Sequence, residues 1–464
     1  MADATTPQAS ALEQPQFWTL DRLADALGAG PRGPTAISRI STDTRNVGQG
    51  SCFIALKGDT FDAHDFLADA VKHGAIALVV NDARRVAGLG VPIYEVPDTL
   101  VALGLLGRYR RRVWGRPVVG VVGTIGKTST KELLKAALGG AFHVHATVGN
   151  YNNLVGVPLT LFALPDDADI AVIEMGTNHP GEVEALRVIV EPDIVVVTSI
   201  AEEHLEGLGD LAGVLREEAS ACKGVSLAVT PAAQPEVAEA AKPLARRTIS
   251  AGLDSGDVRP ASWGVEVDGQ GWIEYEGTRV RIPLRGVHNS RNAMLAIAVA
   301  REAGVSMEAL AAGIAAMPSP PMRVNFEAHG RATIINDAYN SNPGSARVAL
   351  ELLEHAGKDR QRVAILGTML EMGEHADRLH DEVARTALDS PVELIVGVGG
   401  FADALQRMAP GDSRTVAGAD PAAAWDVLRS RLAPDAVILL KGSRGVRLER
   451  LVPMIAEWAN SLNT

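Results

Sequence analysis

The sequence predicts an α/β fold that is divided into three domains. Short buried strands alternate with helical stretches along most of the chain, which is typical of parallel sheets covered by helices. The 464 residues suffice for about three domains at roughly 150 residues each. Three prolines in MPSPPMR, residues 317–323, indicate a linker. We therefore expect an N-terminal mixed α/β domain over 1–104, a central domain with a parallel sheet over 105–318 and a C-terminal Rossmann-like domain over 319–464.

The first domain begins after a polar tail of about fifteen residues. Residues 17–29, FWTLDRLADALGA, have the apolar spacing of an amphipathic helix, and 64–75 repeat that spacing. The apolar runs SCFIAL (51–56) and AIALVV (75–80) predict buried strands. The segment VPIYEVPD, residues 91–98, closes the unit.

The central domain alternates strands with helices, which predicts parallel βαβ units. A helix rich in leucine and arginine over about residues 99–114 leads into RPVVGVV, a buried strand that ends at a glycine loop. Two further strands, DIAVIEMG and PDIVVVTSI, occupy residues 169–176 and 192–200. Residues 255–285 instead alternate by twos around glycine turns, as an antiparallel meander does, and 288–305 return to helix.

The third domain contains four apolar runs that each end in a polar or glycine loop. They are predicted strands at 332–339, 362–367, 392–400 and 436–443. Ligands of such open sheets bind at the carboxyl ends of the strands. The GVGG of Gly397–Gly400 is not a full dinucleotide fingerprint, and we interpret it as a turn.

Composition excludes several function classes. The chain is 47% hydrophobic and 22% charged, as in ordinary globular proteins. The N-terminus lacks the pattern of a signal peptide, and no apolar run approaches the ~20 residues of a membrane helix. Cys52 and Cys222 form neither a disulfide framework nor a metal spacing, so we expect reduced thiols in a cytoplasmic protein.

The net charge of −12 argues against a nucleic-acid partner. The one basic cluster, RYRRR at Arg108–Arg112, is interpreted as a solvated helix end. Anionic small molecules remain possible substrates, because backbone N–H groups and a local lysine can bind them.

The run GVVGTIGKTSTKE, Gly120–Glu132, is similar to a phosphate-binding loop but shorter than the common G-x-x-x-x-G-K-S/T. Gly123 and Gly126 allow close approach of the backbone to phosphate, Lys127 can neutralise charge, and the Thr128 hydroxyl can bind Mg²⁺. An ordinary glycine turn with a surface lysine is the alternative. The predicted strand before the loop and the helix after it favour phosphate binding.

Two residues near strand ends are candidate metal ligands. Glu174 ends the strand at 169–176, where an isolated buried carboxylate would be costly and a divalent cation would compensate it. An exposed strand-end acid is the alternative. His204 follows the strand at 192–200, and a structural histidine and a metal ligand are equally consistent with that position.

Three asparagines crowd the loop before an apolar helix in ATVGNYNNLVGVPLTL. They are Asn150, Asn152 and Asn153. Asparagine is common in turns for its own backbone bonding, and the same cluster would suit a polar substrate. Both interpretations stand.

Together these residues resemble the Mur ligase family, ATP-dependent amide-forming enzymes that build the peptidoglycan peptide. The loop G-T-x-G-K-S/T is that family's own, which accounts for the short pattern at Gly123–Thr128. The resemblance extends from about Leu20 to Val452. It is carried by GNYNNLVGVPLTL, EMGTNHPGE, HLEGLGDLAGV, GVHNSRNAMLA, NDAYNSNPGS, LGTMLEMGEHADRLH and KGSRG. The chain is most similar to the members that add D-alanyl-D-alanine to UDP-N-acetylmuramoyl-tripeptide.

The resemblance implies the fold and the ligands of each domain. STDTRNVGQGSCFIALKGDTFDAHDF is similar to the family's uridine-nucleotide segment, so the first domain would bind the uridine substrate. The implied ATP site comprises Gly123, Thr124, Ile125, Gly126, Lys127, Thr128, Ser129, Asn289, Asn292, Arg323, Asp337, Tyr339 and Asn340. The implied substrate contacts are Thr42, Arg45 and Lys57 for the uridine diphosphate, Asn150, Asn152 and Asn153 in the asparagine loop, and Lys441, Ser443 and Arg444 for the peptide or dipeptide carboxylates.

The implied reaction centre contains ATP, Mg²⁺ and the residues Lys127, Thr128, Glu174, His204 and Glu218. The tripeptide carboxylate would attack the γ-phosphate to give an acyl phosphate, and the amine of D-alanyl-D-alanine would displace phosphate. Such chemistry needs positioning and charge neutralisation more than covalent help. Small molecules are then the only expected partners, and we expect a monomer.

The chain departs from the family at one metal position. Most members carry a lysine after HLEG that is carbamylated and presents a carboxylate to the second Mg²⁺. The aligned stretch is AGVLREEASACKG, where Glu218 takes that position beside Glu217. We interpret Glu218 as a substitute that offers the same charge without CO₂. Lys223 is the competing candidate.

Two other functions remain as alternatives. A sister ligase with a different amino-acid donor would share the same site. A P-loop switch or assembly ATPase would hydrolyse ATP without a carboxylate and an amine substrate. Three domains that each present polar strand-end loops argue against the switch.

Overall fold

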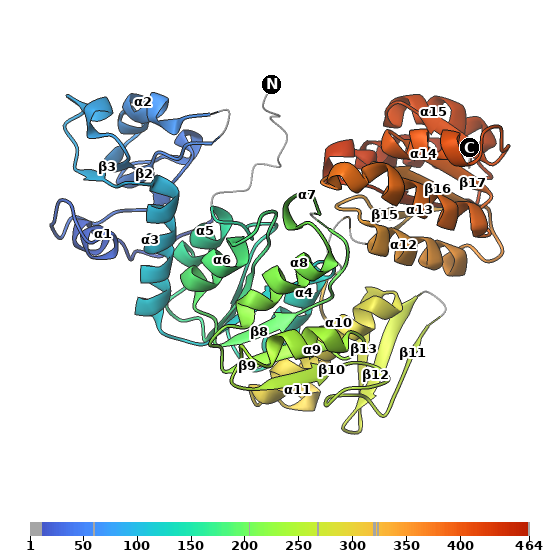
Figure 1. Ribbon diagram of the computed structural model, residues 1–464, viewed down its shortest axis with the longest axis horizontal. Helices are drawn as coiled ribbons and strands as arrows, with labels where there is room; N and C mark the ends of the chain where they lie inside the picture. Colours follow the sequence, from blue (N-terminus) through green and yellow to red (C-terminus); the bar gives the residue numbers. More distant parts are fainter. Residues whose placement is uncertain are drawn as a thin grey trace. The chain divides into compact units, whose positions relative to one another are not determined.

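The computed structural model describes residues 12–58, 61–203, 205–266, 269–318, 322 and 324–462. The chain divides into two compact units (Figure 1). The first comprises Met1–Val122, Phe142–Thr177 and Gly181–Val195, and the second comprises Gly123–Ala141, Asn178–Pro180 and Val196–Thr464.

The first unit contains a four-stranded parallel sheet in the order β1-β2-β3-β4. Its strands are β1 (Ile40–Ser41), β2 (Ser51–Ile54), β3 (Ala75–Val80) and β4 (Ile93–Glu95), and its helices are α1 (Leu20–Leu27) and α2 (Leu67–Lys72). Successive β2 side chains enter opposite cores: Phe53 packs with Leu67 of α2, and Ile54 packs with Leu23 of α1. The predicted strands at 51–56 and 75–80 are confirmed, and the segment 91–98, which was expected to close the unit, contains β4.

The helix α3 (Thr99–Trp114) begins where the Asp98 carboxylate accepts the Leu100 N–H at 2.7 Å. The expected domain boundary between residues 104 and 105 lies inside this continuous helix. Both expected domain boundaries, 104/105 and 318/319, stay predictions.

The basic cluster Arg108–Arg112 of α3 was interpreted as a solvated helix end, and this interpretation is wrong for two of its arginines. Arg110 is 1% exposed and lies 2.6 Å from Asp166, while Arg111 is buried and lies 3.0 Å from Asp193. The paired acids compensate the charge of the two buried guanidinium groups.

The central sheet has six strands in the order β10-β9-β8-β5-β7-β6. The first unit holds β5 (Val118–Val122), β6 (Val144–Ala146), β7 (Ile170–Glu174), the start of β8 (Ile194–Val197), α5 (Gly156–Phe162) and α6 (Glu182–Val190). The second unit holds β9 (Leu227–Pro231), β10 (Thr248–Ala251), α4 (Lys127–Leu138), α7 (Leu205–Leu208), α8 (Leu211–Ala219) and α9 (Pro235–Ala241). The predicted strands are confirmed as β5, β7 and β8, and β5 pairs with β7 in parallel. β5 and β8 are almost wholly buried, as strands covered on both faces must be.

The second unit also contains the predicted meander and the third α/β sheet. The meander is antiparallel, with β11 (Ser262–Val265), β12 (Gln270–Tyr275) and β13 (Thr278–Arg285), and it precedes α10 (Val287–Glu302) and α11 (Met307–Ala315). The third sheet has the order β14-β15-β19-β16-β17-β18. Its strands are β14 (Asn325–His329), β15 (Ala332–Asp337), β16 (Arg362–Gly367), β17 (Leu394–Val398), β18 (Thr415–Gly418) and β19 (Val437–Lys441).

Only β14 is antiparallel in this third sheet, among the described pairings. Its helices are α12 (Pro343–Ala356), α13 (Ala376–Asp389), α14 (Gly400–Met408), α15 (Pro421–Leu428) and α16 (Leu451–Ser461) (Figure 1). All four predicted strands are confirmed, while β14 and β18 were not predicted. Among the described residues, none of the helices combines the length and the apolar composition that a membrane crossing requires.

Cys52 and Cys222 are buried and free, in agreement with the expected reduced thiols. Burial raises the pKa of each thiol to about 12, which keeps both protonated and unreactive.

Candidate functional site

The glycine loop requires glycine at both of its positions. Gly123 has φ 119° and Gly126 has φ 89°, in the region that side-chain-bearing residues rarely adopt. A Cβ at Gly123 would lie 2.3 Å from the Thr198 hydroxyl oxygen, and a Cβ at Gly126 would lie 2.7 Å from the Asn292 amide nitrogen. The two glycines therefore let this loop pack against β8 and α10.

The loop is tied to the segment that follows β8. Thr124 donates its N–H to the Ser199 carbonyl at 2.7 Å, and its hydroxyl accepts the Ala201 N–H at 3.1 Å. The Lys127 ammonium donates to the Thr124 carbonyl at 3.2 Å and also to that of Gly123. The helix α4 begins at Lys127, and its N-cap residue Gly126 provides no side-chain cap. Its first-turn N–H groups and a lysine thus meet at one loop, the arrangement that suits an anion.

Glu218 reaches this loop from α8. Its side chain is 2% exposed, and its Oε2 accepts the Gly123 N–H at 2.8 Å. Lys223, the competing candidate, lies beyond the end of α8 and is exposed. The position that the sequence assigns to the family's modified lysine therefore carries a buried carboxylate next to the loop.

Glu174 is the last residue of β7 and is 2% exposed. Its Oε1 accepts a hydrogen bond from the Asn152 amide at 2.9 Å. Asn153 instead accepts the Gly156 N–H at 2.8 Å at the start of α5, and Asn150 is exposed. Asn152 thus orients the Glu174 carboxylate, whereas Asn153 bonds to the local backbone, which is one of the two roles that the sequence left open.

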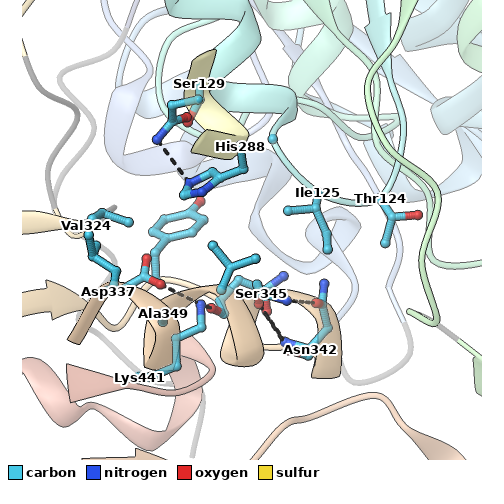
Figure 2. A pocket seen from close by; sticks show the side chains of 16 residues that line it. Thr124, Ile125, Ser129, His288, Val324, Asp337, Asn342, Ser345, Ala349 and Lys441 are labelled. Atoms are coloured by element: carbon cyan, nitrogen blue, oxygen red, sulfur yellow. Dashed lines mark hydrogen bonds and ion pairs between the residues drawn. The ribbon is translucent and has the colours of Figure 1, made fainter. Parts of the chain in front are cut away.

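A pocket of about 110 Å³ lies within the second unit (Figure 2). It brings together nine of the predicted site residues. They are Thr124, Ile125, Gly126, Ser129, Asn289, Asp337, Tyr339, Asn340 and Lys441. The remaining lining residues, which the sequence did not single out, are His288, Val324, Asn342, Ser345, Val348, Ala349 and Leu352. Polar groups at the loop and apolar side chains of α12 therefore share one cavity.

An ion pair lies at one side of this pocket (Figure 2). The Lys441 ammonium is 2.8 Å from Asp337 Oδ2 and donates to the Asn340 carbonyl at 2.7 Å. The Asn340 amide in turn donates to Glu203 Oε1 at 2.7 Å. Lys441 was expected at the peptide or dipeptide carboxylates, yet it lies among the residues expected to bind ATP.

His288 and Asn289 line the pocket at the start of α10. The Asn289 amide nitrogen lies 2.8 Å from the Arg285 carbonyl oxygen and 3.0 Å from His288 Nε2. Desolvation lowers the pKa of His288 to about 4, so the ring is neutral at pH 7 and can accept this hydrogen bond. His288 is the first residue of the phrase HNSRN, from which the sequence singled out only Asn289 and Asn292.

The other residues of KGSRG lie elsewhere. The buried Ser443 hydroxyl accepts the Leu370 N–H at 3.0 Å and so holds the loop after β16. Arg444 is exposed, with Glu449 at 3.7 Å and the Met322 sulfur at 2.9 Å. Neither lines the 110 Å³ pocket.

A second pocket, of about 230 Å³, lies within the first unit. It is lined by Leu12, Gln14, Arg39, Ile40, Ser41, Thr42, Asp43, Asn46, Tyr151, Val155 and Leu159. Of the three expected uridine-diphosphate contacts, only Thr42 is among them. The Arg45 side chain is 84% exposed and lies 2.7 Å from Asp43. The hydrogen bond from Arg45 lowers the pKa of the Asp43 carboxyl. Lys57 is exposed. Arg39, which no motif indicated, supplies the cation of this pocket.

Two expected site residues, His204 and Arg323, lie outside the described residues. Across the described ranges, no group of three or more histidine, cysteine or acidic side chains could hold a metal ion. The metal ligands that the sequence predicts include the Thr128 hydroxyl, which is none of these side-chain types, and His204, which lies outside the described residues.

Three family models match successive parts of the chain. The Mur ligase family catalytic domain matches residues 36–111, the Mur ligase middle domain matches 121–300, and the Mur ligase glutamate ligase domain matches 322–444.

Curated relatives extend the similarity over almost the whole chain. A Bacillus subtilis (strain 168) protein named UDP-N-acetylmuramoyl-tripeptide--D-alanyl-D-alanine ligase is 30% identical over 91% of this chain and 94% of its own length. The Escherichia coli (strain K12) protein of the same name is 32% identical over 95% and 98%.

Solved structures have the same architecture. A crystal structure of MurF from Acinetobacter baumannii matches with a TM-score of 0.88 and 31% identity, over 96% of this chain and all of that one. MurF ligase from Thermotoga maritima in complex with ADP matches with a TM-score of 0.81 and 25% identity, over 91% and 98%. With family models in all three predicted domains and relatives of at least 30% identity along its length, this chain belongs to the Mur ligase family.

Proposed function

We propose that this chain is an ATP-dependent C–N ligase that adds D-alanyl-D-alanine to UDP-N-acetylmuramoyl-tripeptide in peptidoglycan precursor synthesis. The single observation that carries the proposal is the full-length similarity to ligases of that name, at 30% and 32% identity. The similarity includes the N-terminal domain, where a uridine substrate would bind. ADP and phosphate are the other products. We place the enzyme in the cytoplasm as a monomer.

The ATP site is the 110 Å³ pocket together with the glycine loop. The loop N–H groups and Lys127 hold the phosphates, since both lie at the uncapped start of α4. Asn289, Asp337 and Tyr339 line the adjoining cavity and hold the adenosine. Ile125 and Ser129 line it too, while Asn292 backs Gly126. For the γ-phosphate we propose Arg323, on the family resemblance, since this residue lies outside the described ranges.

Magnesium fits the donor chemistry of the expected ligands. Thr128, Glu174 and Glu218 offer the oxygen atoms that Mg²⁺ prefers, and His204 adds a nitrogen. The buried carboxylates of Glu174 and Glu218 each carry a charge that a cation would compensate. Bound Mg²⁺ would neutralise phosphate charge during transfer. Glu174 ends β7 in register with Val121 of β5, two residues before the loop begins.

The protein groups position the two substrates rather than react with them. The tripeptide carboxylate oxygen attacks the γ-phosphorus, and ADP leaves. The amine nitrogen of D-alanyl-D-alanine then attacks the acyl carbon, its C–N bond forms, the C–O bond to phosphate breaks, and the amine proton is lost. Lys127 and the loop amides stabilise the phosphoryl charge in both steps.

The uridine substrate lies along the 230 Å³ pocket of the first unit. Thr42 lines this pocket, and Tyr151, beside the three asparagines, forms another wall. Arg39 brings a cation to it and holds the Leu12 carbonyl at 3.2 Å. We therefore propose that Arg39, rather than Arg45 or Lys57, binds the diphosphate of this substrate. Ser443 and Arg444 remain proposed contacts of the incoming peptide or dipeptide.

The test is phosphate release from ATP and Mg²⁺ with UDP-N-acetylmuramoyl-tripeptide, with D-alanyl-D-alanine added or withheld. Release that requires both, with a pentapeptide product by mass spectrometry, is the expected result. Release that requires a single amino acid instead would assign a sister ligase step. Release without either substrate would overturn the ligase proposal in favour of an ATPase switch.

A further inference from the structure

The buried Lys441 lies at the end of β19, where sheet topology sets its partners. Lys441 is 2% exposed, and it pairs in register with Asp337 across the parallel strands β19 and β15. Side chains at paired positions project from the same face of a sheet. The Lys441 ammonium consequently lies 2.8 Å from Asp337 Oδ2.

The same ammonium also holds the loop that follows β15. It donates to the Asn340 carbonyl at 2.7 Å, three residues beyond Asp337. One buried cation therefore fastens both ends of the segment Asp337–Asn340, and Asp337, Tyr339 and Asn340 all line the 110 Å³ pocket. A buried lysine is tolerated only when its charge is paired and its donors are bonded, and this segment supplies both conditions.

The neighbouring residues of the KGSRG motif have different surroundings. Arg444, three residues later, is exposed, whereas the Lys441 side chain is only 3% exposed. Two of the Lys441 donors are already directed at Asp337 and at the Asn340 carbonyl, and a peptide carboxylate would compete with the buried Asp337 for this ammonium. The geometry thus separates Lys441 from Arg444, although both belong to one short motif.

We infer that Lys441 is a positioning residue of the nucleotide pocket and makes no contact with the dipeptide. Its ammonium orients the Asp337 carboxylate and the Asp337–Asn340 backbone toward the nucleoside. This inference rests on the proposed ATP site. It predicts that a change at Lys441 weakens nucleotide binding and leaves the use of D-alanyl-D-alanine unchanged.

The experiment measures ADP binding by titration calorimetry in the intact protein, without other substrates. Lys441→Met keeps most of the side-chain volume and removes the charge. We expect the Kd for ADP to rise about tenfold, because charge-assisted hydrogen bonds are lost. The double variant Lys441→Met/Asp337→Asn should bind ADP no more weakly than the weaker single variant, because the two residues act as one unit. Lys358→Met, an exposed lysine after α12, is the matched control and should leave the Kd unchanged.

Steady-state kinetics separate the two roles of Lys441. The KM for ATP should rise in Lys441→Met while the KM for D-alanyl-D-alanine stays within about twofold. An unchanged Kd for ADP with a raised KM for the dipeptide would overturn the inference. If circular dichroism shows that Lys441→Met does not fold, Lys441→Gln, which keeps a hydrogen-bond donor, is judged by the same two constants. Failure of the unaltered protein to bind ADP would instead refute the proposed ATP site.

Discussion

At the scale of single residues, Glu218 tests whether a carboxylate can replace the modified lysine of the family. Its buried side chain accepts the Gly123 N–H at 2.8 Å. Glu218→Gln keeps an acceptor oxygen for that bond but removes the charge. We expect phosphate release at saturating substrates to fall by about a hundredfold, the usual effect of removing one electrostatic group at a reaction centre.

Lys223→Ala is the control for this prediction, because Lys223 is exposed beyond the end of α8. It should retain nearly full activity. Equal losses in the two variants would refute the assignment of Glu218. We also expect the activity of the unaltered protein to be insensitive to removal of CO₂ and bicarbonate, since Glu218 needs no carbamylation.

Arg39 and Arg45 are six residues apart, and the structure distinguishes them. Arg39 lines the 230 Å³ pocket, whereas the Arg45 side chain is 84% exposed and already paired with Asp43. We expect Arg39→Ala to raise the Kd for UDP about tenfold and to leave the Kd for uridine nearly unchanged, because only UDP has the diphosphate. Calorimetry with both compounds measures the difference.

Arg45→Ala serves as the matched control and should change the Kd for UDP by less than about twofold, as expected for an exposed ion pair. A larger rise in the Kd for UDP in Arg45→Ala than in Arg39→Ala would show that the diphosphate lies at the turn Thr42–Arg45.

At the scale of elements, the loop after β15 is joined to the loop after β8. Asn340 donates to the buried Glu203 at 2.7 Å, and Glu203 immediately precedes the proposed metal ligand His204 in sequence. We expect Asn340→Ala and Glu203→Ala each to lower kcat/KM for ATP about tenfold, and the double variant to lower it no further. Residues in one hydrogen-bond network couple by roughly 0.5–3 kcal/mol, which a double-mutant cycle measures.

An ion pair between α13 and the loop after β8 provides the control. Arg378 lies 3.7 Å from Glu202, and both side chains are solvent-accessible. Arg378→Ala should stay within about twofold of the unaltered protein. Additive losses in the double variant of Asn340 and Glu203 would mean that the two loops act independently.

At the scale of the whole molecule, two histidines are held in their neutral form: His380 is buried and His288 is partly buried. Desolvation lowers the pKa of both His288, to about 4, and His380. His380 Nε2 accepts the Met369 N–H at 2.9 Å, a bond that protonation would break. The unfolded chain binds more protons than the folded one below about pH 6.5, so stability is full above that pH and falls as the pH decreases toward 4.

We therefore expect the melting temperature to fall between pH 7.5 and pH 5, with about 2 kcal/mol lost at pH 5 through His288 alone. The measurement is thermal denaturation followed by circular dichroism. His288→Gln should flatten this pH dependence, whereas His355→Gln, at an exposed position, should not. An unchanged slope in His288→Gln would contradict the prediction.

The sequence alone determined the family, the three-part α/β architecture and the glycine loop. These three features depend on local patterns in the sequence: buried strands that alternate with helices, a helix that begins after Gly126, and short motifs along the chain that resemble the family. The four predicted strands of the third domain were correct for the same reason, because short apolar runs bounded by loops form strands in almost any packing. The strands β14 (NFEAH) and β18 (TVAG) lie at the two edges of the sheet, and they were missed because neither contains the long apolar run of the predicted strands.

Only the tertiary structure decided the partners of the charged residues. Lys441 meets Asp337 because β19 inserts between β15 and β16, an order that the sequence does not contain. Arg110 and Arg111 are buried because acids about 55 and 80 residues away compensate them. Arg39 rather than Arg45 lines a pocket because the 3₁₀ turn η1 (Thr44–Asn46) directs Arg45 to Asp43. Which charged residues pair across long sequence separations depends on how the strands and helices pack. A sequence motif can therefore identify a functional residue, but the packing determines which groups that residue contacts.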